Sequence, residues 1–144
     1  MNKALSLAVA ATLSCASLNS EAQTMIGKTT DVAAIANGDR MNAETLWAMG
    51  RIGGAAASPD GNTIVYQVGY YSVKQNKSHQ MLYTISADGK KQCALTTTAA
   101  SETDATWIDG GKRIAFLTGG QLWSMNADGT DRRQLTKSEI DIEG

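Results

Sequence analysis

The side chains that most often carry catalysis are sparse in this sequence. His79 is the only histidine and stands in a polar stretch, so a serine or cysteine nucleophile would have no other imidazole as its base. The Gly-x-Ser-x-Gly segment that presents a serine on a sharp turn occurs nowhere in the chain. Cys93 falls on an expected strand, and we interpret it as a small core residue. We therefore assign no catalytic residue.

Two short motifs have some features of ligand sites. The stretch "NADGTD" at Asn126–Asp131 faintly echoes a calcium loop, but Lys137 stands at the twelfth position, where calcium requires a bidentate glutamate. The stretch "GRIGG" at Gly50–Gly54 follows an expected helix instead of opening one, so it does not suit a phosphate group. We expect no metal site and no cofactor.

One segment is a candidate contact surface. The stretch "GYYSVKQNKSHQ" at Gly69–Gln80 reads as a long loop, and loops on a rigid scaffold often carry function. Within it we expect Tyr70, Tyr71 and His79 to contact peptides. The alternative is that this loop is only the solvated tip of a hairpin.

The charge balance argues against two classes of partner. The chain has 13 Lys and Arg against 14 Asp and Glu, and no block of basic residues occurs. Because nucleic acids and anionic lipids attract clustered cations, we expect neither as a partner. Without a basic groove beside them, the three tryptophans read as packing residues and not as a platform for stacking bases; they are Trp47, Trp107 and Trp123.

Residues 1–22 have the build of a secretory signal peptide: a positively charged start, an apolar run, and small residues before a cut ahead of Gln23. We therefore expect export, to the periplasm or out of the cell. The apolar run is shorter than the ~20 residues of a membrane-spanning helix, which disfavours an uncleaved anchor. A lipoprotein through Cys15 is a weaker alternative. After cleavage only Cys93 would remain, so we expect no internal disulfide.

The chain contains an internal repeat. "LYTISADGKKQCALT" at Leu82–Thr96 and "LWSMNADGTDRRQLT" at Leu122–Thr136 agree at six of fifteen positions and start 40 residues apart. The repeat extends upstream, because "SPDG" and an apolar run precede the first copy, as "IDGG" and an apolar run precede the second. Each unit reads as four short strands rich in β-branched and aromatic residues and joined at Asp-Gly turns, where Gly accepts positive φ and Asp tolerates it.

Four antiparallel strands in a unit of this period are typical of a propeller blade. The predicted fold class is therefore all-β, with two four-stranded blades of an incomplete β-propeller after one short helix. Two blades cannot close a ring that takes about 4–8. The expected segments are a signal peptide (1–22), a lead-in (23–54) with a helix (43–49), two blades (55–96 and 103–136) and the start of a further blade (137–144).

These motifs resemble a known family. "SPDG" before an apolar strand, "LYTISADG" and a closing "LT" are similar to the WD40-like repeats of the TolB type, which also form the N-terminal propeller of prolyl oligopeptidase family serine peptidases. "ETLWAMGRIGGAAASPDGNTIVYQV" at Glu44–Val68 is closer still to the start of exported acylaminoacyl-peptidase and dipeptidyl-peptidase-5-like members. The resemblance runs from about Asn42 to the end of the chain.

The resemblance implies a role without catalysis for this stretch. In that family a C-terminal α/β-hydrolase domain carries a Ser-Asp-His triad, and the propeller restricts access to short peptides. None of the triad residues has a counterpart here, so the chain would be the N-terminal part of an exported serine exopeptidase. Its partners would be peptide substrates and its own downstream blades and hydrolase domain. The alternative is a periplasmic TolB-like binding module without a catalytic domain.

Overall fold

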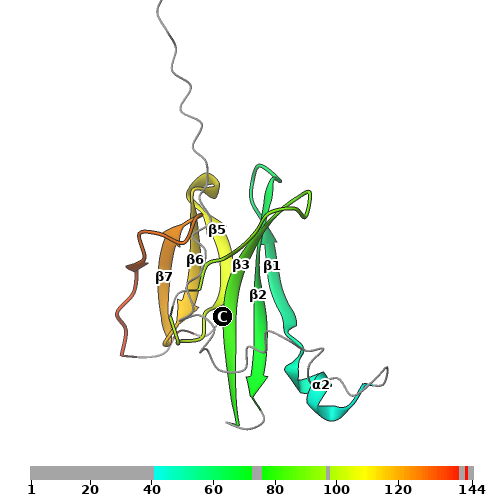
Figure 1. The fold of residues 1–144 in the computed structure, drawn as a ribbon. Coiled ribbons are helices and arrows are strands. Elements are labelled where there is room, and N and C mark those ends of the chain that lie inside the picture. Colours follow the sequence, from blue (N-terminus) through cyan, green and yellow to red (C-terminus); the bar gives the residue numbers. More distant parts are fainter. Residues whose placement is uncertain (1–40, 73–75, 97, 140–141, 143–144) are drawn as a thin grey trace, which may run out of the picture.

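A computed structural model describes residues 41–72, 76–96, 98–139 and 142 of the chain. Figure 1 shows two sheets side by side, with one short helix at the start of the first. The elements in chain order are α2 (Ala43–Ala48), β1 (Arg51–Ala57), β2 (Thr63–Ser72), β3 (Lys77–Ser86), β4 (Gln92–Ala94), β5 (Thr103–Ile108), the 3-10 turn η2 (Asp109–Gly111), β6 (Arg113–Thr118), β7 (Gln121–Asn126) and β8 (Arg133–Gln134).

The predicted fold class is confirmed. The strands form two four-stranded sheets in the orders β1-β2-β3-β4 and β5-β6-β7-β8, and every neighbouring pair is antiparallel. The two sheets also share a register, because Tyr66 pairs with Tyr83 in the first sheet and Phe116 pairs with Trp123 in the second. The sequence repeat is therefore a repeat of structure, position by position.

The helix α2 is capped as its sequence indicates. The Asn42 side-chain oxygen accepts hydrogen bonds from the Thr45 backbone N–H and hydroxyl, at 2.7 and 2.8 Å. This satisfies one of the N–H groups that a helix start leaves without a partner. Met49 already has an extended backbone, with φ −69° and ψ 133°, so the helix stops at Ala48. The first strand begins soon after, at Arg51, inside the stretch expected as a lead-in.

In the Asp-Gly turn between β5 and β6, Asp109 and Gly110 both have the expected positive φ, 51° and 62°. The other three turns differ from the expectation of two-residue turns with Asp in a left-handed conformation. In them only glycine takes the positive φ, with values of 71° at Gly61, 74° at Gly89 and 85° at Gly129. The preceding aspartates instead accept hydrogen bonds within the turn; Asp60, for example, accepts from the Ser58 hydroxyl and the Asn62 backbone N–H. These turns are longer than two residues, and a carboxylate that ties down the turn suits such loops.

A tight two-residue turn joins β6 to β7. Gly119 and Gly120 have φ values of 56° and 68°, and the flanking Thr118 and Gln121 are paired. Two consecutive positive φ values are those of a type I′ hairpin, whose twist matches the twist of the strands.

The Leu-Thr pair that ends each repeat closes its sheet in the same way. In the first sheet, the Leu95 and Thr96 backbone N–H groups donate to the Leu82 carbonyl, and the Leu82 N–H donates to the Thr96 hydroxyl oxygen at 2.6 Å. The second sheet repeats the pattern with Leu135, Thr136 and Leu122. A threonine hydroxyl thus extends the ladder past the end of the short fourth strand.

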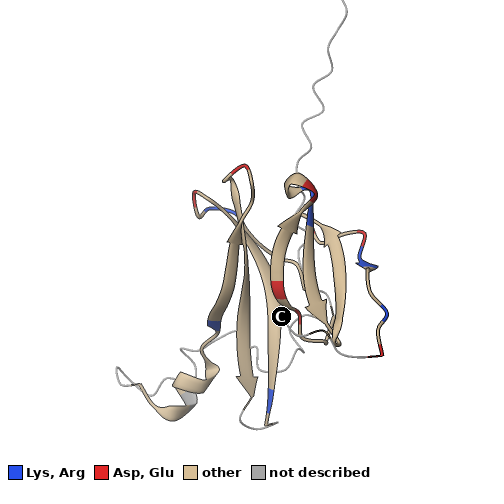
Figure 2. Cartoon of the chain, turned by 180° about the vertical axis from the view of Figure 1, so that it is seen from behind, with Lys and Arg blue, Asp and Glu red and all other residues tan. Residues whose placement is uncertain are grey.

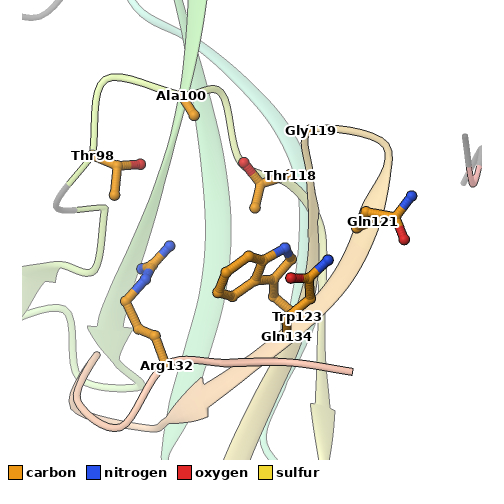
Figure 3. A pocket seen from close by; sticks show the side chains of 8 residues that line it. All are labelled: Thr98, Ala100, Thr118, Gly119, Gln121, Trp123, Arg132 and Gln134. Carbon is orange, nitrogen blue, oxygen red and sulfur yellow. The ribbon is translucent and has the colours of Figure 1, made fainter. Parts of the chain in front are cut away.

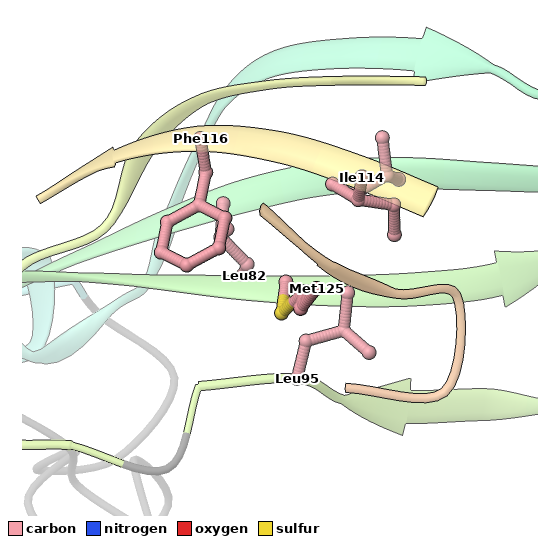
Figure 4. Close-up of a cluster of buried hydrophobic side chains, with 6 residues drawn as sticks. Leu82, Leu95, Ile114, Phe116 and Met125 are labelled. Carbon is pink, nitrogen blue, oxygen red and sulfur yellow. The ribbon is translucent and has the colours of Figure 1, made fainter. Parts of the chain in front are cut away.

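The largest hydrophobic core lies between the two sheets. Figure 4 shows its side chains reaching from both sheets toward one another. We call this cluster the junction core; its buried members are Val65, Leu82, Leu95, Ile114, Phe116 and Met125. Burial of such side chains is worth about 1.5–3 kcal/mol each, so the junction core is what joins the sheets.

Cys93 is disulfide-bonded in the structure of the chain with residues 1–22 in place. The expectation of no internal disulfide concerned the chain after removal of those residues, and it stays a prediction. The other cysteine of the sequence, Cys15, lies outside the described residues.

The surface carries scattered charges of both signs. In Figure 2 red marks the tips of several turns and also part of one strand, and blue is scattered over both sheets. Among residues 41–72, 76–96, 98–139 and 142, no helix has the length and apolar character needed to cross a bilayer.

Candidate functional site

The three residues expected to contact peptides lie in a hairpin and not in a long loop. Strands β2 and β3 pair as far as Ser72 with Lys77, and this register places Tyr70 opposite His79. The expected loop at Gly69–Gln80 is therefore wrong for most of its length. Its polar residues are typical of a loop. In the structure they instead extend the antiparallel pairing that begins in the apolar part of β2 and β3.

The alternation of side chains along a strand divides these residues between two faces. Neighbouring residues point to opposite faces, so Tyr71 lies on one face of the sheet and Tyr70 on the other. His79 is directly opposite Tyr70 and shares its face. The structure thus brings Tyr70 and His79 together and separates both from Tyr71.

Tyr71 belongs to an exposed cluster that the sequence reasoning missed. The Arg51 guanidinium lies 4.8 Å from the centre of the Tyr71 ring and 5.1 Å from that of Trp47, and the two rings meet edge to face at 5.7 Å. Trp47 is 43% exposed and Tyr71 37%. Trp47 is on the short helix and Arg51 starts β1, so only the hairpin's position beside the helix assembles this cation-π group.

Tyr70 joins a second, mostly buried cluster on the opposite face. Its hydroxyl is 3.3 Å from that of Tyr83, and the Tyr83 ring stacks on Tyr66 with centroids 5.7 Å apart. We call this group the outer cluster; its buried members are Val68, Met81 and Tyr83. Burial raises the pKa of the Tyr83 hydroxyl, so that group stays protonated and serves as a hydrogen-bonding group.

His79 is buried beside that cluster, with 1% of its surface exposed. Its Nε2 atom has no hydrogen-bond partner among the residues that the structure describes. Burial lowers the pKa of the imidazole, because an apolar environment disfavours the charged form. A neutral, buried histidine whose Nε2 meets no hydroxyl of the described residues is not arranged as the base of a nucleophile.

A pocket of about 320 Å³ opens on the second sheet, beside the junction core, against which Trp123 packs. Figure 3 shows Trp123 in the middle of its lining, with Arg132 on one side and Gln121 on the other. We call it the junction pocket. It is lined by Thr98, Ala100, Thr118, Gly119, Gln121, Trp123, Arg132 and Gln134, which come from the second sheet and from the connection that precedes it.

A buried ion pair stands at the wall of the junction pocket. Arg132 donates to the carboxylate of Glu102, whose side chain is fully buried, and its guanidinium lies 4.8 Å from the centre of the Phe116 ring. The same carboxylate accepts from the hydroxyls of Thr96 and Thr98, each at 3.2 Å. The charge of Arg132 is therefore balanced inside the protein.

A difference between the two copies of the repeat marks this pocket, and the sequence analysis did not use it. The shared register makes Thr118, Gln121 and Gln134 equivalent to Val68, Met81 and Ala94 of the first sheet. The first sheet fills these positions with the apolar side chains of the outer cluster. The second sheet has three polar residues there, and this difference is visible once the two copies are aligned.

The described residues include no group of three or more His, Cys, Asp or Glu side chains that could hold a metal ion. In the turn that echoes a calcium loop, the Asp128 carboxylate accepts from the Thr130 N–H at 3.0 Å and from its hydroxyl at 2.6 Å. The carboxylate thus stabilises the turn through hydrogen bonds of its own.

Comparison with known proteins identifies related sequences and a related fold. Over 108 residues, 72% of the chain, the sequence is 41% identical to dipeptidyl-peptidase 5 of Porphyromonas endodontalis, and the match covers 16% of that protein. The dipeptidyl-peptidase 5 of Porphyromonas gingivalis is 38% identical over 87 residues, 59% of the chain and 13% of that protein. No family model matches the chain.

Among solved structures, the acylaminoacyl peptidase of Pyrococcus horikoshii shares the fold with a TM-score of 0.54 at 14% identity, over 66% of this chain and 15% of that one. The chain therefore spans about a sixth of the length of the relatives it matches. The family resemblance noted in the sequence is confirmed over part of the chain.

Proposed function

We propose a function from the premise that this chain is homologous over part of its length to dipeptidyl-peptidase 5 and acylaminoacyl peptidase, and corresponds to the propeller region of the prolyl oligopeptidase family. The proposed function is that of the N-terminal propeller part of a serine exopeptidase of the dipeptidyl or acylaminoacyl type. The observation that carries it is the 41% identity over 108 residues.

In this proposal the chain guides substrates and does not cleave them. The lone histidine is buried and neutral, and the sequence lacks the serine elbow, so nucleophile and base must come from a hydrolase domain that follows these blades. A rigid pair of sheets beside an active site would admit short, flexible peptides and exclude folded proteins. The sheets have the necessary rigidity, because the junction core and its inter-sheet hydrogen bonds hold them together.

The partners and the location follow from the same proposal. Peptide substrates meet the chain through the full-length protein, in which further blades and the hydrolase domain are its structural neighbours. The signal-peptide pattern of residues 1–22 supports export, to the periplasm or out of the cell.

An activity assay on the protein produced from the whole gene tests the proposal. The expected result is release of dipeptides or of acylated amino acids from short chromogenic peptides, with complete loss of activity after treatment with a serine-directed covalent inhibitor. Peptides of more than a few tens of residues should be poor substrates. If the protein has no inhibitor-sensitive peptidase activity, the proposal fails and the TolB-like binding module is favoured. Fractionation of the native host, with the protein found in the cytoplasm, would contradict the proposed export.

A further inference from the structure

We propose that the junction pocket binds a short, uncharged stretch of peptide, with one residue seated against Trp123 of the second sheet. The choice of a peptide rests on the proposed function. The location of the site and the chemistry of its ligand rest on the pocket itself, which lies apart from both clusters that hold Tyr70, Tyr71 and His79.

The first argument is the break in the repeat. Where the first sheet has Val68, Met81 and Ala94, the second has Thr118, Gln121 and Gln134. Apolar residues at these positions would pack closely, as the outer cluster does. The polar residues of the second sheet instead line an open volume of about 320 Å³, within the size range of small-ligand pockets.

The second argument is the hydrogen-bonding capacity left open in the pocket. The indole N–H of Trp107, at the same junction, donates to the Ala56 carbonyl at 2.9 Å. In contrast, the Trp123 indole N–H and the Gln134 side-chain amide have no hydrogen-bond partner in the described part of the chain. Gln121 does not share this capacity, since its side chain already bonds the backbone of Ser138. An indole donor beside a free amide matches the alternating carbonyl and N–H groups of a peptide.

The third argument concerns charge. Among the described residues that line the pocket, only Arg132 is charged, and it is paired with the buried carboxylate of Glu102. A charged ligand would disturb a balanced pair, whereas a neutral ligand would leave it intact. The Trp123 ring offers a broad apolar surface for one side chain of the peptide. In this arrangement the Trp123 indole N–H donates to a peptide carbonyl. The Gln134 side-chain carbonyl accepts from a peptide N–H.

The test measures binding in the protein produced from the whole gene, after its catalytic serine has been blocked by a covalent inhibitor. The probe is N-acetyl-Ala-Phe-Ala amide, which carries no charge, and the measurement is isothermal titration calorimetry. We expect Trp123→Phe, which keeps an aromatic ring but removes the N–H, to raise Kd about tenfold, the cost of one lost hydrogen bond. Gln134→Ala, which restores the residue type of the first repeat, should raise Kd by a similar factor.

Gln92→Ala is the matched control, because Gln92 is an amide on the fourth strand of the first sheet, away from the pocket. It should leave Kd unchanged, and the urea midpoints of all three variants should be measured to verify folding. Equal Kd values for the wild type, Trp123→Phe and Gln134→Ala would overturn the inference, as would no binding by the wild type at millimolar probe. A protein without peptidase activity that still binds the probe through Trp123 would contradict the proposed function while supporting the pocket.

Discussion

The indole N–H of Trp107 donates a hydrogen bond to the backbone carbonyl of Ala56, 2.9 Å away, and so ties the second sheet to the first strand of the first sheet. The two residues are 51 positions apart in the chain. Nearby, the Asp104 backbone N–H donates to the Gln67 side chain at 3.1 Å and makes a second link between the sheets. Directional bonds of this kind fix how the sheets sit on the junction core.

Replacing Trp107 with Phe should destabilise the protein through loss of that link. The ring remains to pack at the junction, but the Ala56 carbonyl loses its partner, and the expected loss is about 1 kcal/mol of unfolding free energy. Urea denaturation followed by circular dichroism measures it. Trp123→Phe is the control, since that indole N–H has no partner in the described structure; an equal effect of the two changes would contradict the role of the hydrogen bond.

Truncating the centre of the junction core should have a much larger effect. Phe116 is fully buried, so Phe116→Ala should lower the unfolding free energy by about 3–5 kcal/mol through lost burial and a cavity. Leu135→Ala, at a side chain that is 50% exposed, should cost far less. Similar urea midpoints for the two variants would show that the sheets are not held together by this core.

The buried ion pair gives a double-mutant test. Arg132→Met leaves the fully buried Glu102 carboxylate without its charged partner, and the expected cost is about 3 kcal/mol. Changing both residues, with Glu102→Leu added, should recover most of that stability, because no unpaired charge then remains. If the double variant is less stable than Arg132→Met alone, the carboxylate has other essential partners, such as Thr96 and Thr98.

In the first Asp-Gly turn, the pKa of the Asp60 carboxyl is lowered. The Ser58 hydroxyl and the Asn62 backbone N–H hold the pKa of the Asp60 carboxyl at about 2, below its ordinary value of 3.8. The ionised Asp60 carboxylate therefore stabilises the folded state above pH 3.8, and this contribution is lost as pH falls through about 2. Ser58→Ala should raise this pKa toward the ordinary value, as measured by carbon-detected NMR titration of the carboxyl group. An unchanged pKa would mean that the hydroxyl does not bond the carboxylate in solution.

His79 predicts a second pH effect, in a different range. Its buried imidazole has a pKa below the ordinary 6.5, so the unfolded chain binds the proton more readily than the folded one. The unfolding free energy should therefore not depend on His79 protonation above pH 6.5, and it should decrease as the pH falls below that value. His79→Phe should remove this part of the pH dependence, seen as the change in Tm between pH 8 and pH 5.5. An equal change in Tm in both proteins would exclude His79 as its source.

The site was predicted less well than the fold, for a specific reason. The polar residues of "GYYSVKQNKSHQ" predict a loop, yet the ends of this stretch are paired in β2 and β3, with Tyr70 opposite His79. Local composition cannot reveal that a partner strand continues the ladder. In the same way, Arg51 reaches Trp47 and Tyr71 only because helix and hairpin meet in space.

The local sequence specified most of the strands of this protein and the repetition of its two sheets, apart from the far end of the β2–β3 hairpin. Alternating apolar residues, Asp-Gly turns and closing Leu-Thr pairs act over a few residues, so each copy of the repeat specifies the same four strands. Only the tertiary structure decided which faces meet. The junction core, the Trp107 bond to Ala56 and the pocket around Trp123 join residues far apart in the chain, and their contacts depend on how one sheet docks against the other.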